Sequence, residues 1–330
     1  GRSPRRGGPS SAYGGEIVRI AVIGAGGVGG YFGALLARAA EWAEPGSALH
    51  EARVGFLARG RHLRVMRRDG LTVESVHGRF SIRPVASDRG VRLAEELAVA
   101  PGQGADLVLL AVKAYSLEGA LDEMEPLVGA DTAILPLMNG VDHLEVLERR
   151  FGRERVLGGL CHIETALVEP GRIRQTSPRR DITFGELDGR VTPRVERIAA
   201  AFAAAGIPHR ISTQIVADMW MKLIFISAMG GMTAVANRPL GAVLGDPDGR
   251  QVYERMVREA VAVARAAGVD LPADAFEQVM ATTMGMDPAM TSSMQRDLAA
   301  RRPVEVDALC GTVVRYGQRH GVDTPCQQAV

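Results

Sequence analysis

The chain has 330 residues, of which 46% are hydrophobic and 23% are charged, and its formal net charge is +1. That composition is typical of a globular protein, and the length is sufficient for two domains. Because the net charge is close to zero, no overall field would recruit nucleic acid or a membrane surface, and we expect neither as a partner. Cys161, Cys310 and Cys326 lie far apart and have neither zinc-site nor disulfide spacing, so we expect no metal site and a reducing, cytoplasmic environment.

Two segments could be mistaken for a targeting signal or a membrane-spanning helix. Residues 1–16 are rich in Arg, Gly, Pro and Ser and have no apolar core, so they are predicted to be a disordered tail rather than a secretory signal. The longest apolar run, Leu223–Ala236, is shorter than the about 20 apolar residues that a membrane-spanning helix needs. We predict that this run is a buried helix.

Short apolar runs alternate with helical stretches in the N-terminal half of the chain. The runs are predicted to be buried strands at Val18–Ile23, Arg53–Leu57, Asp106–Val112 and Ala133–Leu137. Strands that are separated by helices, as at Val28–Ala40, form right-handed βαβ units and a parallel sheet that helices cover on both faces. This half is therefore predicted to be Rossmann-like.

The pattern changes after the fourth predicted strand. Residues 156–186 are predicted to form shorter, more polar strands around a turn at Glu169-Pro170-Gly171. From Ser212 onward the chain is almost wholly helical, with Ser212 or Thr213 as the expected cap of a long first helix. A last helix is predicted to begin near Pro303, because proline favours the first turn of a helix.

We therefore predict an α/β fold of two domains. A Rossmann-like domain with a parallel sheet occupies residues 17–211, and an all-helical C-terminal domain occupies residues 212–330. The second domain would hold the substrate, and it offers a surface through which a homodimer could form.

A glycine-rich turn, Gly24-Ala25-Gly26-Gly27-Val28-Gly29, follows the first predicted strand and opens the first predicted helix. In such a turn the first glycine permits the sharp bend, the second lets the backbone approach a pyrophosphate, and the third lets helix and strand pack closely. The helix N-terminus adds free N–H groups and the positive end of a dipole. The turn predicts a dinucleotide cofactor bound by Gly24, Gly26, Gly27, Val28 and Gly29.

The end of the second predicted strand, Phe56-Leu57-Ala58-Arg59-Gly60-Arg61, carries no carboxylate. NAD-binding proteins usually place Asp or Glu there to bind the ribose hydroxyls, and that charge would repel the 2′-phosphate of NADP. A guanidinium can instead bind the phosphate through two hydrogen bonds. We predict NADP (NADPH) as the cofactor, with Arg59 as the main ligand of its 2′-phosphate and Arg61 as a weaker one; the alternative is a solvated basic loop.

Six ordered motifs together form a recognisable pattern. They are Val28-Gly29-Gly30-Tyr31, Leu57-Ala58-Arg59-Gly60, Val112-Lys113-Ala114-Tyr115, Asn139-Gly140-Val141, Trp220-Met221-Lys222-Leu223, and Ser292-Ser293-Met294 followed by Glu305-Val306-Asp307. With these motifs the sequence resembles the ketopantoate reductase (2-dehydropantoate 2-reductase) family from about Ile17 to about Thr324. Six motifs in this order and spacing are far more specific than any one of them.

The resemblance implies an activity and a set of site residues. Enzymes of this family reduce a 2-oxo acid by hydride transfer from NADPH, and the family's named substrate belongs to pantothenate biosynthesis. The resemblance implies that Lys222 is the general acid and that Glu305 acts beside it and the substrate. It further implies that Ser293 binds the substrate carboxylate, that Lys113 lies near the nicotinamide, and that Asn139 lies near both nicotinamide and substrate.

These roles agree with the chemistry of ketone reduction. Hydride attack leaves an alkoxide that must be stabilised and protonated, and an ammonium group such as that of Lys222 can do both. Structural alternatives exist for each residue: Lys222 could reach solvent at the start of its helix, and Asn139 could serve an ordinary Asn-Gly turn. Lys113 could be a surface lysine, Glu305 a first-turn carboxylate, and Ser293 a helix-start hydroxyl.

The chain departs from the family at two positions where asparagines commonly line the substrate pocket, because it has Ile226 and Gly230 there. A site that loses such amides loses discrimination for a substrate hydroxyl, unless Ser227 or Asn237 compensates. We predict NADPH-dependent reduction of a 2-oxo acid, with 2-dehydropantoate or a close analogue favoured. The alternatives are an NADP-dependent 3-hydroxy acid dehydrogenase and a non-catalytic NADP-binding sensor.

Overall fold

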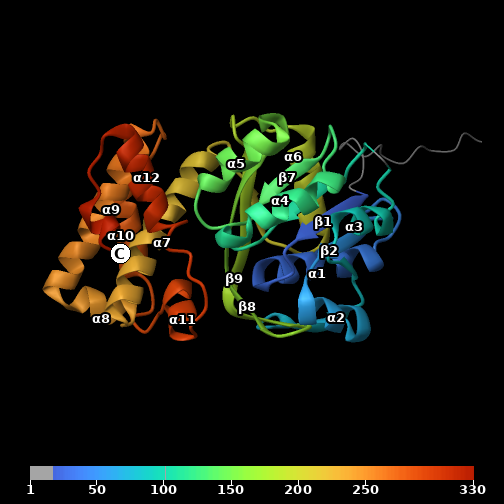
Figure 1. The fold of residues 1–330 in the computed structure, drawn as a ribbon, viewed down its shortest axis with the longest axis horizontal. Coiled ribbons are helices and arrows are strands. Elements are labelled where there is room, and N and C mark those ends of the chain that lie inside the picture. The colour runs from blue at the N-terminus through green and yellow to red at the C-terminus, as the bar shows by residue number, and fades with distance from the viewer. Residues whose placement is uncertain (1–17, 101) are drawn as a thin grey trace, which may run out of the picture. The chain divides into compact units, whose positions relative to one another are not determined.

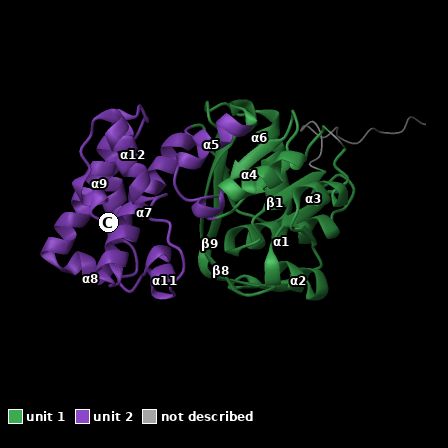
Figure 2. Cartoon of the chain, viewed as in Figure 1, with its two compact units in different colours: residues 1–112, 118–137, 151–213 green, residues 113–117, 138–150, 214–330 purple. Residues whose placement is uncertain are grey.

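The computed structural model describes residues 18–100 and 102–330 (Figure 1). The tail predicted over residues 1–16 lies outside this part of the chain. The described residues divide into two compact units (Figure 2). Unit 1 contains the described residues up to 112 together with 118–137 and 151–213, and unit 2 contains 113–117, 138–150 and 214–330. The functional domain boundaries at 17–211 and 212–330 stay a prediction.

Unit 1 contains a five-stranded sheet in the order β5-β2-β1-β6-β7, in which all neighbouring strands are parallel. Its strands are β1 (Arg19–Ile23), β2 (Arg53–Leu57), β5 (Val85–Ser87), β6 (Leu107–Leu110) and β7 (Ala133–Pro136). All residues of β6 and β7 are buried, as expected for strands that are covered on both faces. The four predicted strands are present, and the predicted Rossmann-like fold class is confirmed.

Helices cover this sheet. The helices of unit 1 are α1 (Gly27–Glu41), α2 (Gly60–Asp69), α3 (Gly90–Glu96), α4 (Glu118–Met124) and α6 (Pro193–Ala204), with short 3-10 turns η2 (Glu125–Leu127) and η3 (Arg153–Arg155). Helix α1 contacts β1 and β2, and it also contacts β8 and β9 of a second sheet. The buried residues Tyr31, Phe32 and Leu36 lie on α1, so this helix forms the core between the two sheets of unit 1.

The second sheet of unit 1 has the strand order β10-β9-β3-β4, and β8 pairs with β9. Its strands are β3 (Leu71–Ser75), β4 (Gly78–Ile82), β8 (Leu157–Glu169), β9 (Arg172–Glu186) and β10 (His209–Ile211). The prediction of short strands over 156–186 was wrong, because β8 and β9 form one long antiparallel hairpin with two register shifts. The polar stretch that suggested shorter strands is residues 174–181 in the middle of β9, most of which are exposed or half-buried.

Unit 2 is helical. Its elements are η1 (Ala114–Ser116), α5 (Asp142–Phe151) apart from its last residue, α7 (Ile215–Ala236), α8 (Leu240–Gly245), α9 (Pro247–Ala266), α10 (Ala275–Met284), α11 (Ser293–Ala299), α12 (Cys310–His320) and α13 (Pro325–Gln328). Helix α7 is the central element, because it contacts each of α8 to α13. By length and composition α7 could cross a membrane, with a mean hydropathy of 1.4, yet 61% of that apolar window is buried within the structure. This burial is typical of a core helix and agrees with the buried helix predicted over Leu223–Ala236.

The predicted cap of this long helix was wrong. Helix α7 begins at Ile215, and its N-cap is Gln214, which makes no side-chain capping hydrogen bond. Ser212 instead donates its backbone N–H to Phe184 O. The serine therefore continues the pairing of β10 with β9 and is not available as a cap.

The predicted start of the last long helix was also wrong. Helix α12 begins at Cys310, and residues 302–305 are not helical. The Glu305 carboxylate, which was expected in a first helical turn, binds the ammonium of Lys113 and the backbone N–H of Ala114. A tertiary contact has therefore replaced the local interaction that the proline and the acidic residue suggested.

Thr132 ties together the starts of β6 and β7, and its loss should destabilise unit 1. Its buried hydroxyl donates to Ala105 O at 2.6 Å and accepts the Gly129 N–H at 2.8 Å. We expect Thr132→Val to lower the free energy of unfolding by about 2 kcal/mol, because it leaves a buried N–H and C=O unpaired. Thr132→Ser keeps the hydroxyl and should cost less. Urea unfolding that gives equal stabilities for both variants would contradict this.

Candidate active site

The glycine-rich turn of unit 1 has the backbone geometry of a dinucleotide-binding loop. Gly24 adopts φ +94°, and a Cβ there would lie 2.8 Å from the carbonyl oxygen of the residue that follows β6. A Cβ at Gly29 would lie 2.0 Å from Gly24 O, so both positions require glycine. A Cβ at Gly26, by contrast, would meet nothing within 4 Å. This open side at the N-terminus of α1, which begins with Gly27 and Val28, fits a pyrophosphate.

A histidine that sequence reasoning missed supports this turn. Nδ1 of His62 accepts the backbone N–H of Gly171 at 2.9 Å, and Nε2 lies 2.8 Å from Ala25 O. Because Nδ1 accepts, Nε2 must carry the proton that it donates to Ala25 in the glycine turn. Burial lowers the pKa of His62, against the raising effect of its bond to Ala25. The neutral ring therefore links the turn to the tip of the β8–β9 hairpin.

Arg59 lies at the N-cap of α2, directly after β2, and its side chain is exposed. One terminal nitrogen of the guanidinium donates to Gly119 O at 2.8 Å. That bond holds the side chain at the carboxyl end of the sheet, where ligands of α/β folds bind. Arg61 is also exposed, in the first turn of α2. Both arginines therefore lie just beyond the carboxyl end of β2, and their predicted role toward a 2′-phosphate stays a prediction.

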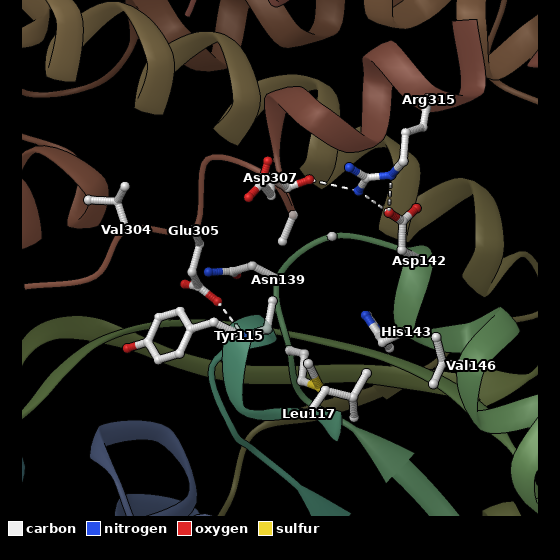
Figure 3. Close-up of a pocket in the computed structure, with 14 residues that line it drawn as sticks. Tyr115, Leu117, Asn139, Asp142, His143, Val146, Val304, Glu305, Asp307 and Arg315 are labelled. Atoms are coloured by element: carbon white, nitrogen blue, oxygen red, sulfur yellow. Dashed lines mark hydrogen bonds and ion pairs between the residues drawn. The ribbon is translucent and has the colours of Figure 1, made fainter. Parts of the chain in front are cut away.

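Unit 2 contains a pocket of about 260 Å³ (Figure 3). Three segments line it, and each brings both polar and apolar side chains. The lining residues are Ala114, Tyr115, Leu117, Met138, Asn139, Gly140, Asp142, His143, Val146, Val304, Glu305, Asp307, Ala308 and Arg315. Two predicted site residues, Asn139 and Glu305, therefore share one cavity.

A partly buried ion pair joins two predicted site residues that are 192 positions apart in the sequence: Glu305 is buried and Lys113 is half-exposed. Lys113 Nζ lies 2.8 Å from Glu305 Oε2 and 3.4 Å from Asp297 Oδ2, and the Ala114 N–H donates to Glu305 Oε1 at 3.1 Å. Burial lowers the pKa of Lys113, but the charges and hydrogen bonds of Glu305 and Asp297 outweigh it and raise the pKa overall. Lys113 is therefore held as a cation. Sequence reasoning missed Asp297, which follows Ser293 by four residues. Nothing in the neighbouring sequence distinguishes it from a solvent-exposed helix residue.

Asn139 is half-buried at the pocket wall, just beyond β7. The next residue, Gly140, adopts φ +86°, and a Cβ there would lie 2.6 Å from Ala308 O. The Asn-Gly pair therefore makes a turn that only glycine can complete, and the same turn presents the asparagine at the pocket. The structural and functional interpretations of Asn139 do not exclude each other.

Lys222 lies half-buried on α7. Its positive charge acts on a second histidine that the sequence analysis missed. His143 on α5 is only 3% exposed. Burial first, and the positive charge of Lys222 second, lower the pKa of His143 to about 4. Its ring is therefore neutral near pH 7. One signal in the sequence could have identified His143: it follows Asn139 by four residues, and Asn139 lies just beyond the carboxyl end of a predicted strand.

The structure separates the two serines of the Ser292-Ser293 motif. Ser292 is the N-cap of α11: its Oγ accepts the Gln295 N–H at 3.0 Å and bonds with the Thr233 hydroxyl at 2.7 Å. Ser293 is the first residue of the helix and is exposed. The helix-start role considered for Ser293 thus belongs to Ser292, and the Ser293 hydroxyl does not serve as the cap.

The structure also shows what surrounds Ile226 and Gly230, the two positions at which the family commonly has asparagine. Ile226 is half-buried on α7, and a Cβ at Gly230 would lie 3.1 Å from the Met294 side chain. Ser227, considered above as a substitute, is fully buried and donates to Ile224 O at 3.3 Å. Asn237, the other substitute, ends α7 in a left-handed conformation and is exposed. Ser227 is therefore committed to the helix interior.

Lys113 offers a direct test of this electrostatic arrangement, because the chain has only two lysines. After reductive methylation with ¹³C-formaldehyde, Lys113 and Lys222 each give a separate NMR signal. Lys113 should titrate above the ordinary lysine pKa of 10.5. Glu305→Gln should lower that pKa, because burial then dominates. Asp297→Asn should lower it less, because its oxygen is farther away; equal effects would contradict the assignment.

Comparisons with known proteins cover nearly the whole described chain. The family model described as "Ketopantoate reductase PanE/ApbA" matches residues 20–189, and its C-terminal counterpart matches residues 214–330. An "uncharacterized oxidoreductase YkpB" of Bacillus subtilis is 34% identical over 95% of this chain and 96% of its own length. A 2-dehydropantoate 2-reductase of Caulobacter vibrioides is 32% identical over 95% of this chain and 97% of its own length.

Solved structures show the same fold. A PanE/ApbA family ketopantoate reductase from Ralstonia eutropha superposes with a TM-score of 0.81 at 29% identity, covering 94% of this chain and 95% of that one. A D-mandelate dehydrogenase solved with NADH and anilino(oxo)acetate has a TM-score of 0.79 at 21% identity, covering 94% and 96%. At that identity the second match establishes the fold alone.

Proposed function

Because the chain belongs to the ketopantoate reductase family, we propose that it reduces a 2-oxo acid to the corresponding 2-hydroxy acid with NADPH. The favoured substrate is 2-dehydropantoate, which would give pantoate, or a close analogue. The predicted family and the predicted enzyme class, an oxidoreductase acting on CH–OH groups, are confirmed by the matches over most of the chain. Reduction of 2-oxo acids with a nicotinamide cofactor is the reaction of this family.

The distribution of lysine and arginine carries the proposal. Of the 39 basic side chains, all but two are arginine, and the two lysines are Lys113 and Lys222. A guanidinium cannot release a proton near neutral pH, whereas an ammonium can. A chain that uses arginine at all its other basic positions thus has its lysines at two of the predicted site positions. This is the composition expected if at least one of the two positions, in this proposal that of Lys222, needs an amine that can release a proton.

Each residue has one task in the proposed reaction. The glycine-rich turn and Arg59 would hold NADPH, which when bound would supply the hydride for C2 of the oxo acid. Lys222 gives its proton to the resulting alkoxide, so the ketone oxygen becomes the hydroxyl. Lys113 and Asn139 orient the nicotinamide and the reacting carbonyl, and Ser293 binds the substrate carboxylate. Glu305 keeps Lys113 charged and in place.

Replacement of Lys222 tests the proton donor. Lys222→Ala should reduce kcat by about 10²–10⁴ while leaving the Kd for NADPH unchanged. Lys222→Arg is the matched control: it keeps the charge but cannot give up a proton, so it should be nearly as slow. Turnover is followed by NADPH absorbance with a panel of 2-oxo acids. An active arginine variant would show that charge alone is sufficient.

The same assays separate the alternatives. Wild-type protein that turns over none of the 2-oxo acids would contradict the proposed function. Oxidation of a 3-hydroxy acid with NADP would favour the hydroxy acid dehydrogenase. A cellular readout that is indifferent to Lys222→Ala, with NADPH binding intact, would favour the non-catalytic sensor.

Replacement of Arg59 tests the choice of NADP over NAD. Arg59→Ala should raise the Kd for NADPH by about 10- to 100-fold, because a charge-assisted hydrogen bond is worth about 1.5–3 kcal/mol. The Kd for NADH should change little. Arg61→Ala serves as a neighbouring control and should have a smaller effect. Equal losses for NADPH and NADH would contradict a 2′-phosphate role for Arg59.

Two further expectations belong to the same proposal. We place the enzyme in the cytoplasm, which suits the three cysteines Cys161, Cys310 and Cys326, none of which forms a disulfide among the described residues. A homodimer would form through the helices of residues 214–330. Sedimentation velocity of wild-type protein would reveal the oligomeric state.

A further inference from the structure

We propose that His143 is a specificity residue whose Nε2 binds a hydroxyl group on the side chain of the 2-oxo acid. The inference deepens the proposed function and rests on it. The ring lines the same pocket as Asn139 and Glu305 and is only 3% exposed. Within residues 18–100 and 102–330, no hydrogen-bond partner lies within reach of Nε2. Buried polar atoms are nearly always hydrogen-bonded, so this one indicates a ligand group.

An unpartnered atom together with a place in the pocket lining distinguishes His143 from other buried polar residues. The described part of the chain has two further buried side-chain atoms without a partner, Oε1 of Gln295 and Oε1 of Gln327. Neither residue lines the pocket. Figure 3 shows His143 and Glu305 on opposite sides of Asn139, with the histidine ring at the end of the pocket away from Glu305. The histidine therefore lies apart from the Glu305 carboxylate, and two other polar residues of the lining, Asp142 and Arg315, are paired with each other.

The protonation state of the ring defines what it can bind. Since the imidazole is neutral near pH 7, one ring nitrogen donates and the other accepts. A neutral ring gives no charge with which to bind a second carboxylate or a cation. A hydroxyl can donate and accept, so it complements Nε2 in either tautomer.

Apolar side chains line the same pocket as the histidine. Leu117, Met138 and Val146 line the cavity together with the ring. These side chains suit a short branched carbon chain that connects the oxo acid group to the hydroxyl. With Ser227 buried in hydrogen bonds of its own, His143 supplies the polar group that Ile226 and Gly230 do not.

The first turn of α5 holds the ring in place. Asp142, the preceding residue, accepts hydrogen bonds from Thr312 Oγ1 at 3.0 Å and from Arg315 Nε at 3.2 Å. Arg315 also donates to Asp307 O at 2.7 Å. A side chain held on a braced helix end can discriminate between ligands that differ by one group.

The test compares two acids that differ only in the hydroxyl. These are 2-dehydropantoate and 3,3-dimethyl-2-oxobutanoate, in which a methyl replaces the hydroxymethyl group. Wild-type enzyme should prefer the first by about tenfold or more in kcat/KM, because the second leaves Nε2 unpaired. His143→Leu should bring the ratio close to one. His143→Gln, whose amide donates and accepts, should restore part of the preference.

A pocket residue without hydrogen-bonding capacity provides the control. Leu117→Ala should change kcat/KM for both acids by a similar factor, because it alters packing alone. An unchanged ratio in His143→Leu would overturn the inference while leaving the proposed function intact. If neither these two acids nor any other 2-oxo acid of the panel is reduced, the proposed function fails, and calorimetric binding of the two acids to wild type and His143→Leu then tests the inference by itself. Equal affinities, or no binding of either acid to wild type, would overturn the inference.

Discussion

The carboxylate of Glu305 is the group on which the pocket of unit 2 depends. One oxygen binds the Lys113 ammonium and the other binds the Ala114 N–H, so both are used in a side chain that is 7% exposed. A buried carboxylate without such partners would be costly. The loop before α12 is non-helical over residues 302–305, and the backbone turns only from Glu305 O, which accepts the N–H groups of Ala308 and Leu309. Its non-helical path places Val304 and Asp307 on the pocket wall.

Sequence reasoning succeeded where the signal was local. The apolar β-branched runs predicted the strands of the parallel sheet, and the glycine spacing predicted a turn in which positions 24 and 29 leave no room for a Cβ. It failed where a distant partner overrode the local preference. Pro303 predicted a helix that begins only at Cys310, because Glu305 is held by a lysine 192 positions away.

The site residues that were missed follow the same rule. His62 and His143 have no motif around them that marks them, and each is notable only through what surrounds its ring. His62 is defined by two backbone groups that lie 37 and 109 positions away. His143 is defined by its burial and by the charge on α7. Sequence spacing cannot express such properties, since they arise from packing between elements that are remote in the chain.

The protonation states in unit 2 narrow the choice of proton donor. Two carboxylates raise the pKa of Lys113, which makes its ammonium a weaker acid and better suited to hold a fixed charge. His143 is unsuited as a proton donor for the opposite reason. Its pKa is about 4, so near pH 7 the ring is neutral and has no imidazolium proton to give. Arginine cannot serve either. Among the basic groups that belong to the predicted site or line the pocket, these limits support Lys222 in its proposed role as the proton donor.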